Sequence, residues 1–473
     1  MVIGIILKDT TMKRATLILL LVVNIACSQN QNKIWYFGGE AGLDFNSGSP
    51  VALTNSAMYQ AEGCATISDT LGNLLFYTDG VTIWNANHFQ MQNGSGLLGD
   101  NSSTQSALIV PKPLNCDKYF IFTVPSQDTL TPLSYSVVDM SFNSGLGKVT
   151  SKNNALHHPV TERINATLKS NGIDYWMVTQ DGDSSSFLVY SISSTGINTS
   201  PMMFPTCNPL PPGPGNSSFL GELKLSKDGS KVGYASQFQN FCVVCDFDNS
   251  NGHISNCYSL TQSGSPYGLE FSPDASKLYV SSLQAPFVLW QYDLSAGSST
   301  AIQNSEQLID STFGPPYQYG GALQLAPDNK IYVGRLQKGF LGVINQPNLS
   351  GVLCNYVDSA VSLNGKICQD ELPNFIKQYS PCSLGTGINT EFSTPVFVIS
   401  PNPFHDITAI EFSNTEREQF TFHLYDINGQ LVEETLNIFT GKVIVEEEDL
   451  SSGMYFFQLE SNKRLIRGKL LKE

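Results

Sequence analysis

A repeated segment of alternating residues is the feature that most constrains the fold of this chain. Segments 223–236, 269–282 and 323–335 share one plan: an alternating strand, a polar turn containing Asp, and a second strand with an aromatic residue. Their starts lie about 50 residues apart, which is the spacing of propeller blades or solenoid units. Looser copies occur at three earlier places, namely 65–80, 108–124 and 166–180.

Each repeat predicts a small antiparallel sheet. Turns such as Asp228-Gly229 and Asn171-Gly172 are expected to join the first two strands as two-residue loops, since Gly and Asn tolerate positive φ. Further strands with outward-facing polar residues follow, for example at 187–193. About four strands per repeat is the content of one propeller blade. The predicted fold class is therefore all-β.

Blades bury both faces against their neighbours, so the ring has to close to protect its ends. The opening strands at 33–46 are expected to pair with residues around 340–380 and to complete a further blade. We predict a propeller of about seven four-stranded blades over 29–383, with six and eight blades left open.

Composition and charge exclude several classes of partner. Only 14% of the residues are charged and 39 are Gly, which favours short strands and turns over solvated helices. The formal net charge of −15 repels nucleic-acid phosphates and anionic lipids, so no nucleic-acid partner is expected. No stretch beyond the N-terminal region offers the roughly 18–20 apolar residues of a membrane-spanning helix.

The N-terminus has the pattern of a secretory signal peptide. Basic residues at 13–14 precede an apolar run at 17–23 and a small-residue exit, so we predict a signal peptide at 1–28. Two alternatives stay open, a start at Met12 and a lipoprotein signal with Cys27 as acceptor.

The cysteines point to oxidation and not to metal binding. Ten are present, and removal of the signal peptide leaves an odd number, so at least one stays a thiol. Cys242 and Cys245 form a CxxC in a strand-like run, where residues three apart face opposite sides of a sheet. A disulfide from Cys245 or Cys242 to Cys257, across a hairpin turning at 249–252, is the more plausible use.

A second domain is predicted after a linker. Residues 384–395 are rich in Gly, Ser and Thr and poor in large apolar residues, as linkers are. Alternation returns at 420–424 and 455–459, with turn residues between these runs. We expect a small antiparallel β-sandwich over 396–473.

This last segment resembles the type A C-terminal sorting domain of the type IX secretion system of Bacteroidetes. The matching motifs are SPNPF (400–404), LYDINGQLV (424–432), DLSSGMYFFQL (449–459) and RGKLLK (467–472). The resemblance implies that the export machinery reads 396–473, that the domain is commonly cleaved, and that the passenger is often joined to surface lipopolysaccharide. The expected sorting-signal residues are Pro401, Asn402, Pro403, Tyr425, Asp426, Gly429, Gly453, Tyr455 and Lys469.

The rest of the chain resembles a family of exported Bacteroidetes β-propeller proteins. The resemblance rests on segments 33–46, 62–94, 102–113 and 135–149. It implies a propeller that is secreted or held on the exterior of the outer membrane, and no agreed activity.

The search for catalytic residues gives only weak patterns. TDGVTIW (78–84) approaches an Asp box once, and we interpret it as a type I′ hairpin at Asp79-Gly80 followed by a packed Trp. DFDNSNG (246–252) reads as a plain turn and not as a calcium loop. We predict no catalytic residue, no metal and no cofactor. A glycosidase requires two carboxylates close together. The carboxylates that could line one mouth of the propeller are Glu62, Asp79, Glu162, Glu222 and Glu270.

Binding is the more natural use of a propeller mouth, where loops from every blade meet. The predicted function is a non-catalytic binding or adhesion module for a glycan or an envelope protein. The alternatives are a secreted glycan-active hydrolase or lyase and a structural envelope component. The candidate ligand-binding residues, which alternatively cap turns and fill a blade interface, are Glu62, Asp79, Trp84, Asn85, His88 and Gln105.

Overall fold

The computed structural model divides the chain into two compact units, Met1–Ser383 and Leu384–Glu473. The predicted signal peptide 1–28 and linker 384–395 lie outside the described residues. The structure describes residues 29–126, 130–209, 219–262, 264–312, 319–381, 397–414, 417–427, 429–446, 450–461 and 465–473.

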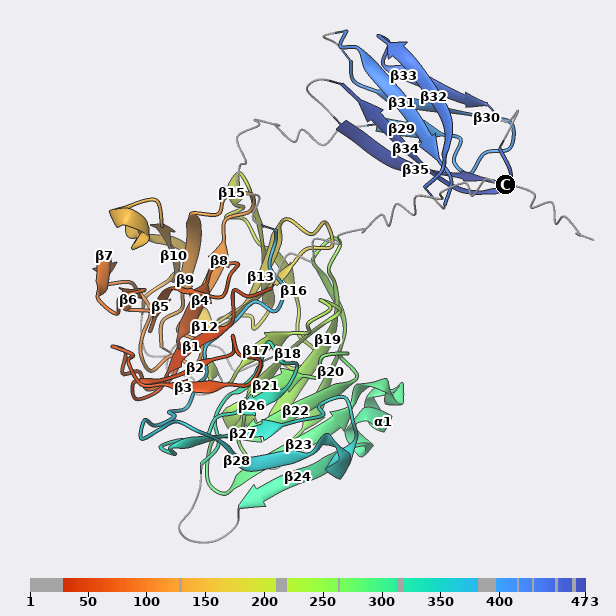
Figure 1. Cartoon of the computed structure of the whole chain (residues 1–473). Helices are drawn as coiled ribbons and strands as arrows, with labels where there is room; N and C mark the ends of the chain where they lie inside the picture. The colour runs from red at the N-terminus through yellow and green to blue at the C-terminus, as the bar shows by residue number, and fades with distance from the viewer. Residues whose placement is uncertain are drawn as a thin grey trace, which may run out of the picture. The chain divides into compact units, whose positions relative to one another are not determined.

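The first unit is a β-propeller, and its blades follow one another along the chain (Figure 1). Blade 1 has three described strands and the later blades have four or five, and blades 2 and 3 are joined into one eight-stranded sheet by a parallel pairing of their outer strands, Lys148 with Gln92. Blades 1 to 3 consist of β1 (Ile34–Phe37), β2 (Ala41–Asp44), β3 (Val51–Leu53); β4 (Ala65–Ser68), β5 (Leu74–Thr78), β6 (Thr82–Asn85), β7 (Gln90–Ser95); and β8 (Ala107–Pro111), β9 (Lys118–Thr123), β10 (Leu133–Asp139), β11 (Lys148–His157).

The remaining four blades repeat this antiparallel order. They consist of β12 (Val160–Leu168), β13 (Tyr175–Asp181), β14 (Phe187–Ser193), β15 (Gly196–Ile197), β16 (Met202–Phe204); β17 (Leu223–Leu225), β18 (Lys231–Ser236), β19 (Phe241–Asp248), β20 (His253–Thr261); β21 (Pro266–Phe271), β22 (Lys277–Ser282), β23 (Phe287–Asp293), β24 (Gln307–Thr312); and β25 (Leu323–Leu325), β26 (Ile331–Val333), β27 (Phe340–Ile344), β28 (Tyr356–Ser362).

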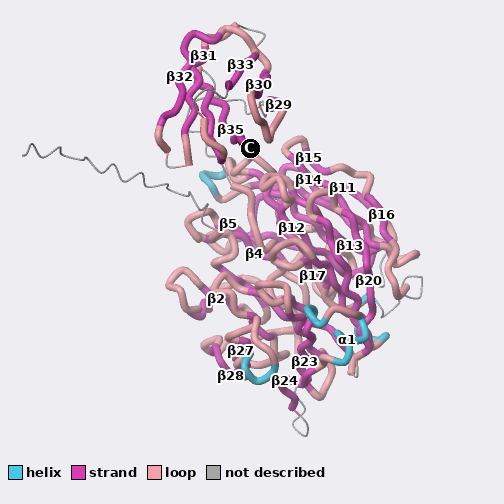
Figure 2. The backbone as a smooth tube through the Cα atoms, turned by 90° about the vertical axis from the view of Figure 1, so that its right-hand side faces the viewer, coloured by secondary structure: helices cyan, strands magenta, loops and turns pink. Residues whose placement is uncertain are grey.

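Helix is scarce in the described residues, as Figure 2 shows. The single α-helix in the part of the chain that the structure describes is α1 (Ser299–Asn304), and 3₁₀ turns lie at Asn143–Gly145, Gln237–Gln239, Leu294–Ala296 and Gly351–Cys354. The predicted all-β propeller of about seven blades is confirmed.

Each blade is buried on both faces because a hydrophobic core lies between successive sheets. The two cysteines of the CxxC demonstrate this alternation. Cys242 packs with residues of blade 6, such as Leu278, whereas Cys245 packs with residues of blade 4, such as Val189. The predicted opposite orientation of the two thiols is therefore confirmed.

The turns between the first two strands of a blade differ from the prediction. Asp228-Gly229 was expected to be a two-residue loop, but the turn spans residues 226–230 between β17 and β18. Only the glycine has positive φ (+69°), and its N–H donates to Ser226 O at 3.0 Å. Asp79-Gly80 is likewise not a type I′ turn, since only Gly80 has positive φ. The side chains of the two aspartates accept hydrogen bonds within these turns. These bonds stabilise a loop that is longer than the predicted two residues.

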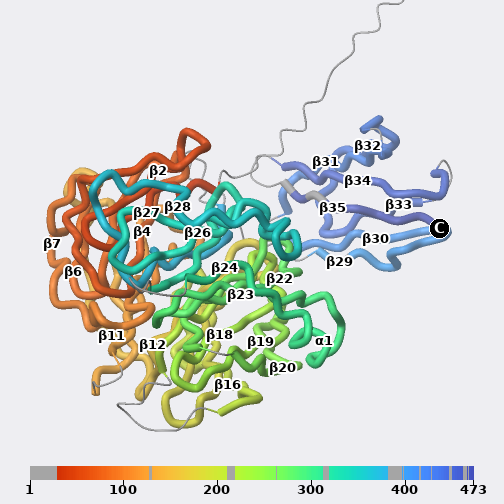
Figure 3. The backbone as a smooth tube through the Cα atoms, turned by 90° about the horizontal axis from the view of Figure 1, so that it is seen from below, coloured from red at the N-terminus to blue at the C-terminus, as the bar shows by residue number. Residues whose placement is uncertain are grey.

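The ring closes by packing and not by the expected strand exchange. The opening strands pair with each other and with β3, and a single bridge joins Gly39 to Ile367. The core of blade 1 meets that of blade 7, where the rings of Trp35 and Tyr332 lie 5.5 Å apart. Figure 3 shows the red strands of blade 1 beside the cyan strands of blade 7. The expected pairing of 33–46 with 340–380 is thus limited to the bridge between Gly39 and Ile367, and it does not complete a blade.

Residues 366–381, which we call the axial segment, instead connect the inner strands around the propeller axis. Asp370 donates its N–H to Ala61 O beside blade 2 and accepts from Ala322 N beside blade 7. Asn374 donates through Nδ2 to Ile164 O of blade 4 at 2.8 Å. Further along the segment, the N–H of Ser380 donates to Tyr175 Oη at 2.7 Å.

Apolar side chains of the axial segment fill the space that the inner strands surround. Leu372, Phe375, Ile376 and Tyr379 are each at most 2% exposed. Polar groups between them are paired, for example Lys377 Nζ with Leu225 O at 2.7 Å. The axis of this propeller is therefore packed by the chain itself.

A disulfide joins Cys245 of β19 to Cys257 of β20, which is one of the two predicted pairings. Closing a loop of 12 residues restricts the unfolded chain by roughly 2–3 kcal/mol. We expect Cys245→Ser with Cys257→Ser to lower the free energy of unfolding by that amount in denaturant titrations. Cys207→Ser, at an exposed free thiol, is the matched control, and equal stability of both variants would contradict the account.

The second unit is a sandwich of two antiparallel sheets around one apolar core that includes Phe422 and Phe457. The first sheet contains β29 (Phe397–Ser400), β30 (Ile407–Phe412) and β33 (Lys442–Glu446), and the second contains β32 (Leu431–Ile438), β31 (Phe420–Tyr425), β34 (Gly453–Glu460) and β35 (Leu465–Lys472). The predicted sandwich is confirmed.

The expected sorting-signal residues hold the turns and the final strand of the sandwich. Asn402 Oδ1 accepts from Leu471 N at 2.8 Å, which ties the Pro-Asn-Pro segment 401–403 to β35. Asp426 Oδ1 accepts from Gln430 N at 2.8 Å in the turn containing Gly429. Tyr455 Oη donates to Ser451 O at 2.7 Å. Gly453 begins β34, and Lys469 lies opposite Phe456 on β35.

Candidate ligand site at the mouth of the propeller axis

The six predicted ligand-binding residues do not form one cluster. Asp79 and Asn85 each hold a turn of blade 2: Asp79 Oδ1 accepts from Thr82 N at 2.7 Å, and Asn85 Oδ1 accepts from Asn87 N at 2.9 Å. Both side chains therefore serve local structure, as the Asx-turn preference of these residues explains.

Trp84 and His88 lie together at the contact between blades 1 and 2. Trp84 stacks on Tyr77 with ring centroids 5.5 Å apart. His88 Nδ1 lies 3.1 Å from Tyr77 Oη, and its Nε2 lies 2.8 Å from Asn55 Nδ2. Burial lowers the pKa of His88, so this ring is held as a neutral packing element.

Gln105 is fully buried near the axis and links three blades. Its Oε1 accepts from Ile164 N of blade 4 and Leu223 N of blade 5, and its Nε2 donates to Leu223 O. Both ends of the amide are thus satisfied by backbone groups. Gln105 holds adjacent inner strands in register.

Three of the five predicted carboxylates make the same kind of link. Glu162 accepts from Thr104 N at 2.7 Å, and Glu222 accepts from Leu269 N and Leu323 N at 2.9 and 3.0 Å. Glu270 accepts from Leu325 N at 3.0 Å. These carboxylates join neighbouring blades through backbone N–H groups.

Buried lysines compensate two of these carboxylates. Lys224 Nζ lies 2.7 Å from Glu222 Oε1, and Lys377 Nζ pairs with Glu270. Burial opposes the charge of Lys224, but the nearby carboxylates raise the pKa of its amine overall. Glu222 and Lys224 are therefore an ion pair inside the propeller.

Glu62 has a different environment, at the end of the axis where the inner strands begin. Its Oε2 accepts from Tyr267 Oη at 3.2 Å, and its Oε1 accepts from Ser102 at 3.4 Å. Asp370 and Glu371 of the axial segment lie beside it, since the N–H of Asp370 donates to Ala61 O at 3.2 Å. We call Glu62, Tyr267, Asp370 and Glu371 the mouth.

The mouth carboxyls hold protons that ordinary carboxyls lose. Burial, reinforced by the charges of Glu162 and Asp370, raises the pKa of Glu62 to about 9. Burial raises the pKa of Asp370 to about 7. Burial and the charge of Glu222 raise the pKa of Glu371 well above its usual range. The mouth is thus a largely buried cluster of carboxyl groups in which burial favours the protonated form, although the charge of Lys224 acts in the opposite direction on Glu371.

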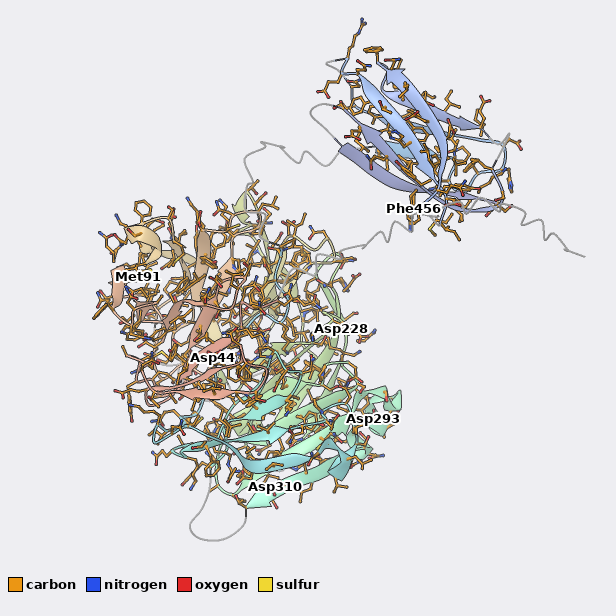
Figure 4. All side chains as sticks on the ribbon, viewed as in Figure 1. Asp44, Met91, Asp228, Asp293, Asp310 and Phe456 are labelled. Carbon is orange, nitrogen blue, oxygen red and sulfur yellow. A yellow bond between two sulfur atoms is a disulfide. The ribbon has the colours of Figure 1, made fainter. Side chains whose placement is uncertain are left out.

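Two acidic side chains in turns of the propeller, Asp228 and Asp293, behave in the opposite way, since the pKa of each is lowered. Figure 4 labels Asp228, in the turn after β17, and Asp293, which ends β23. Burial works against the charge of Asp228, but hydrogen bonds from Ser226 and Ser230 lower its pKa overall. At Glu62 the hydrogen bonds from Tyr267 and Ser102 also lower the pKa, but burial outweighs them.

These shifts predict how stability depends on pH. In the unfolded chain Glu62 and Asp370 lose their protons near pH 4, so the stability that they contribute is complete below that pH. It is lost as pH rises through about 7 for Asp370 and about 9 for Glu62. We expect the melting temperature to fall between about pH 5 and about pH 9, and Glu62→Gln to flatten this decline. A Glu62→Gln profile as steep as the wild-type one, with exposed Glu40→Gln as control, would refute the assignment.

Asp370, Glu371 and Tyr267 were missed by the sequence reasoning. The two acids stand next to Pro373 in an apolar stretch that was assigned to strand pairing. An acidic pair inside such a stretch is the pattern that points to them, because burying a carboxylate is costly unless it is paired or has a function.

The opposite end of the axis carries amines. A cavity of about 300 Å³ there is lined by residues that include Lys227, Lys377 and Asn32. Among the described residues, no group of three or more His, Cys, Asp or Glu is arranged to hold a metal ion. No helix in the described part of the chain is long and apolar enough to cross a membrane.

Residues 398–473 match the family described as the secretion system C-terminal sorting domain. The second unit is a sorting domain. It marks the protein as a substrate of the type IX secretion system, exported to the cell surface or the medium, as the motifs at 400–404 and 424–432 predicted. The sorting domain is therefore the part that interacts with the secretion machinery.

Solved structures resemble the chain at low similarity. The periplasmic gluconolactonase of Pseudomonas aeruginosa is 14% identical, with 78% of this chain and 97% of that chain covered and a TM-score of 0.36. A putative 6-phosphogluconolactonase of Bacteroides fragilis is 11% identical, with 79% and 94% covered and a TM-score of 0.38. The Cps50 (Swd1) β-propeller domain of Myceliophteria thermophila is 10% identical, with 65% and 93% covered and a TM-score of 0.39. No curated protein matches the chain.

Proposed function

We propose that the propeller is a non-catalytic binding module, displayed outside the cell, whose partner is an envelope protein that docks on the mouth. The observation that carries the proposal is the packed axis. Because the axial segment fills the space behind Glu62, a partner contacts the mouth as a surface and does not thread into a channel. Broad loop surfaces of this kind suit protein partners.

Exposed aromatic side chains near the mouth support a protein partner. Tyr59 is 65% exposed, and its Oη accepts from Gln369 Nε2 at 3.1 Å, next to Asp370. Phe238 and Tyr319 are also exposed, and they lie in loops at the end where inner strands begin. Aromatic side chains are enriched where proteins bind one another.

Binding to intact cells tests this function. We expect the labelled full chain to bind the producing bacterium, protease treatment of those cells to abolish binding, and periodate oxidation of their glycans to leave it unchanged. Glu62→Gln with Asp370→Asn should weaken binding at least tenfold, whereas Glu40→Gln should not. Binding that survives protease and is lost on oxidation would instead identify a glycan ligand, and binding unaffected by the double variant would remove the mouth from the account.

The alternative is a secreted glycan-active hydrolase. One observation favours it: Glu62, with its pKa raised to about 9, keeps a proton at neutral pH, as a general acid must. Release of reducing ends from polysaccharides by the full chain, and its loss in Glu62→Gln, would support the hydrolase and contradict the binding module.

A further inference from the structure

The cavity at the end of the axis opposite the mouth has the size of a small-molecule site. Its volume is about 300 Å³, which lies at the lower end of the roughly 300–1,000 Å³ that such pockets have. Leu168 of blade 4, together with Leu325 and Pro327 of blade 7, forms the apolar part of its wall. Amines and amides form the rest, and we call it the lysine cavity.

One ammonium group in the lysine cavity has no carboxylate partner among the described residues. Lys377 pairs with Glu270. Lys227 instead donates to the neutral amide oxygen of Asn329 at 2.6 Å, so two of the three donors of its ammonium remain. None of the residues that line the cavity is acidic. The lysine cavity therefore offers one positive charge to a ligand.

A buried amide in the same cavity has an acceptor without a donor. Asn32 lines the cavity and is 9% exposed, and its Oδ1 accepts no hydrogen bond from the described residues. An acceptor that is removed from water and left unsatisfied is destabilising. A hydroxyl group both donates and accepts, so it pairs with this amide in either orientation of the side chain.

The charge and the amide together select one class of ligand. A carboxylate carries the single negative charge that matches Lys227, whereas a phosphate ester carries nearly two and is repelled by the nearby carboxylate of Glu270. A carboxylate alone has no donor for Asn32 Oδ1, but a hydroxyl on the same molecule supplies one. The C–H groups of a compact ring pack against the apolar part of the wall.

We propose that the lysine cavity binds a free sugar acid, which is a compact ring with one carboxylate and several hydroxyls. The carboxylate accepts from the ammonium of Lys227, and a ring hydroxyl pairs with the amide of Asn32. The bond to Lys227 is charge-assisted, which makes it the stronger of the two. This site lies at the other end of the axis from the mouth, and it does not depend on the docking of an envelope protein.

Three small molecules that differ in one property each test the inference. Galacturonate, galactose, which lacks the carboxylate, and cyclohexanecarboxylate, which lacks the hydroxyls, are titrated calorimetrically into the full chain. We expect galacturonate to bind at least about tenfold more tightly than either of the others, because it alone satisfies both Lys227 and Asn32.

Two variants assign the two contacts. Lys227→Met should abolish the preference for galacturonate over galactose, and Asn32→Leu should abolish its preference over cyclohexanecarboxylate. Lys152→Met is the matched control, since Lys152 lies in β11 of blade 3 and donates to Ser95 O, and it should keep both preferences. Thermal unfolding confirms that each variant is folded.

Galacturonate that binds no more tightly than galactose would overturn the inference, because the charge of Lys227 would then not be recognised. Galacturonate and cyclohexanecarboxylate of equal affinity would likewise exclude a sugar acid. Preferences that persist in both Lys227→Met and Asn32→Leu would place the ligand outside the lysine cavity.

Discussion

A chain that ends after Gly365 is expected to lose the folded propeller, whereas a chain that ends after Ser383 is expected to keep it. The difference is the axial segment. Full burial of an apolar side chain contributes about 1.5–3 kcal/mol, so Leu372, Phe375, Ile376 and Tyr379 together contribute roughly 6–12 kcal/mol. The total stability of a folded domain is about 5–15 kcal/mol. Loss of the axial segment therefore removes a stabilising free energy comparable to the total stability of the propeller.

Far-UV circular dichroism and denaturant unfolding of the two truncated chains measure this effect. The longer chain ends at the boundary between the two units, so it controls for loss of the sorting domain. A cooperative transition of similar midpoint in both chains would mean that the inner strands close the ring without the segment.

Glu222→Ala is expected to be the most destabilising single substitution of a polar residue in the propeller. The carboxylate accepts the N–H groups of Leu269 and Leu323 and contacts the ammonium of Lys224 at 2.7 Å, with no exposure to solvent. Its removal leaves two backbone donors without an acceptor and takes from the buried ammonium of Lys224 the carboxylate that it contacts, which costs about 3–5 kcal/mol.

Urea titration gives the loss in free energy of unfolding. Glu40→Ala is the matched control, since Glu40 forms an exposed ion pair with Lys366 that contributes at most about 1 kcal/mol. Glu222→Gln should fall between the two, because the amide keeps an acceptor and loses the charge. A loss below about 1 kcal/mol for Glu222→Ala would contradict the proposed link between blades.

Sequence reasoning found the features that depend on local patterns. Alternation and regular spacing predicted the blades, because each strand alternates between two buried faces. The motifs at 400–404 and 424–432 predicted the sorting domain because they resemble those of that family. Cys245 and Cys257 are close in sequence and lie on the two strands of one hairpin, β19 and β20. Their short separation along the chain was therefore enough to suggest the disulfide.

Features that depend on distant contacts were not predictable in the same way. The axial segment follows the last strand, and nothing in its own pattern distinguishes an axial position from a blade edge. Glu162, Glu222 and Glu270 were considered only as carboxylates able to line one mouth, because the sequence does not show that they accept hydrogen bonds from backbone N–H groups of neighbouring blades. Asp370 reaches the mouth only because the segment turns inward.

The candidate site was therefore predicted in part. Glu62 was named because it belongs to the stretch that resembles the propeller family, and it lies at the mouth. Asp79, Asn85 and Trp84 were named with it because they are near in sequence, yet turns and a blade interface use them. Proximity along the chain is a poor guide in a ring whose blades meet at the axis.

The central claim is that burial and the charges of neighbouring carboxylates make the mouth carboxyls keep their protons. Infrared difference spectroscopy of the carboxylic acid carbonyl band measures this directly. We predict a band at neutral pH that disappears as pH rises through about 9 and that is reduced in Glu62→Gln. A wild-type protein with no protonated carboxyl at neutral pH would contradict the account.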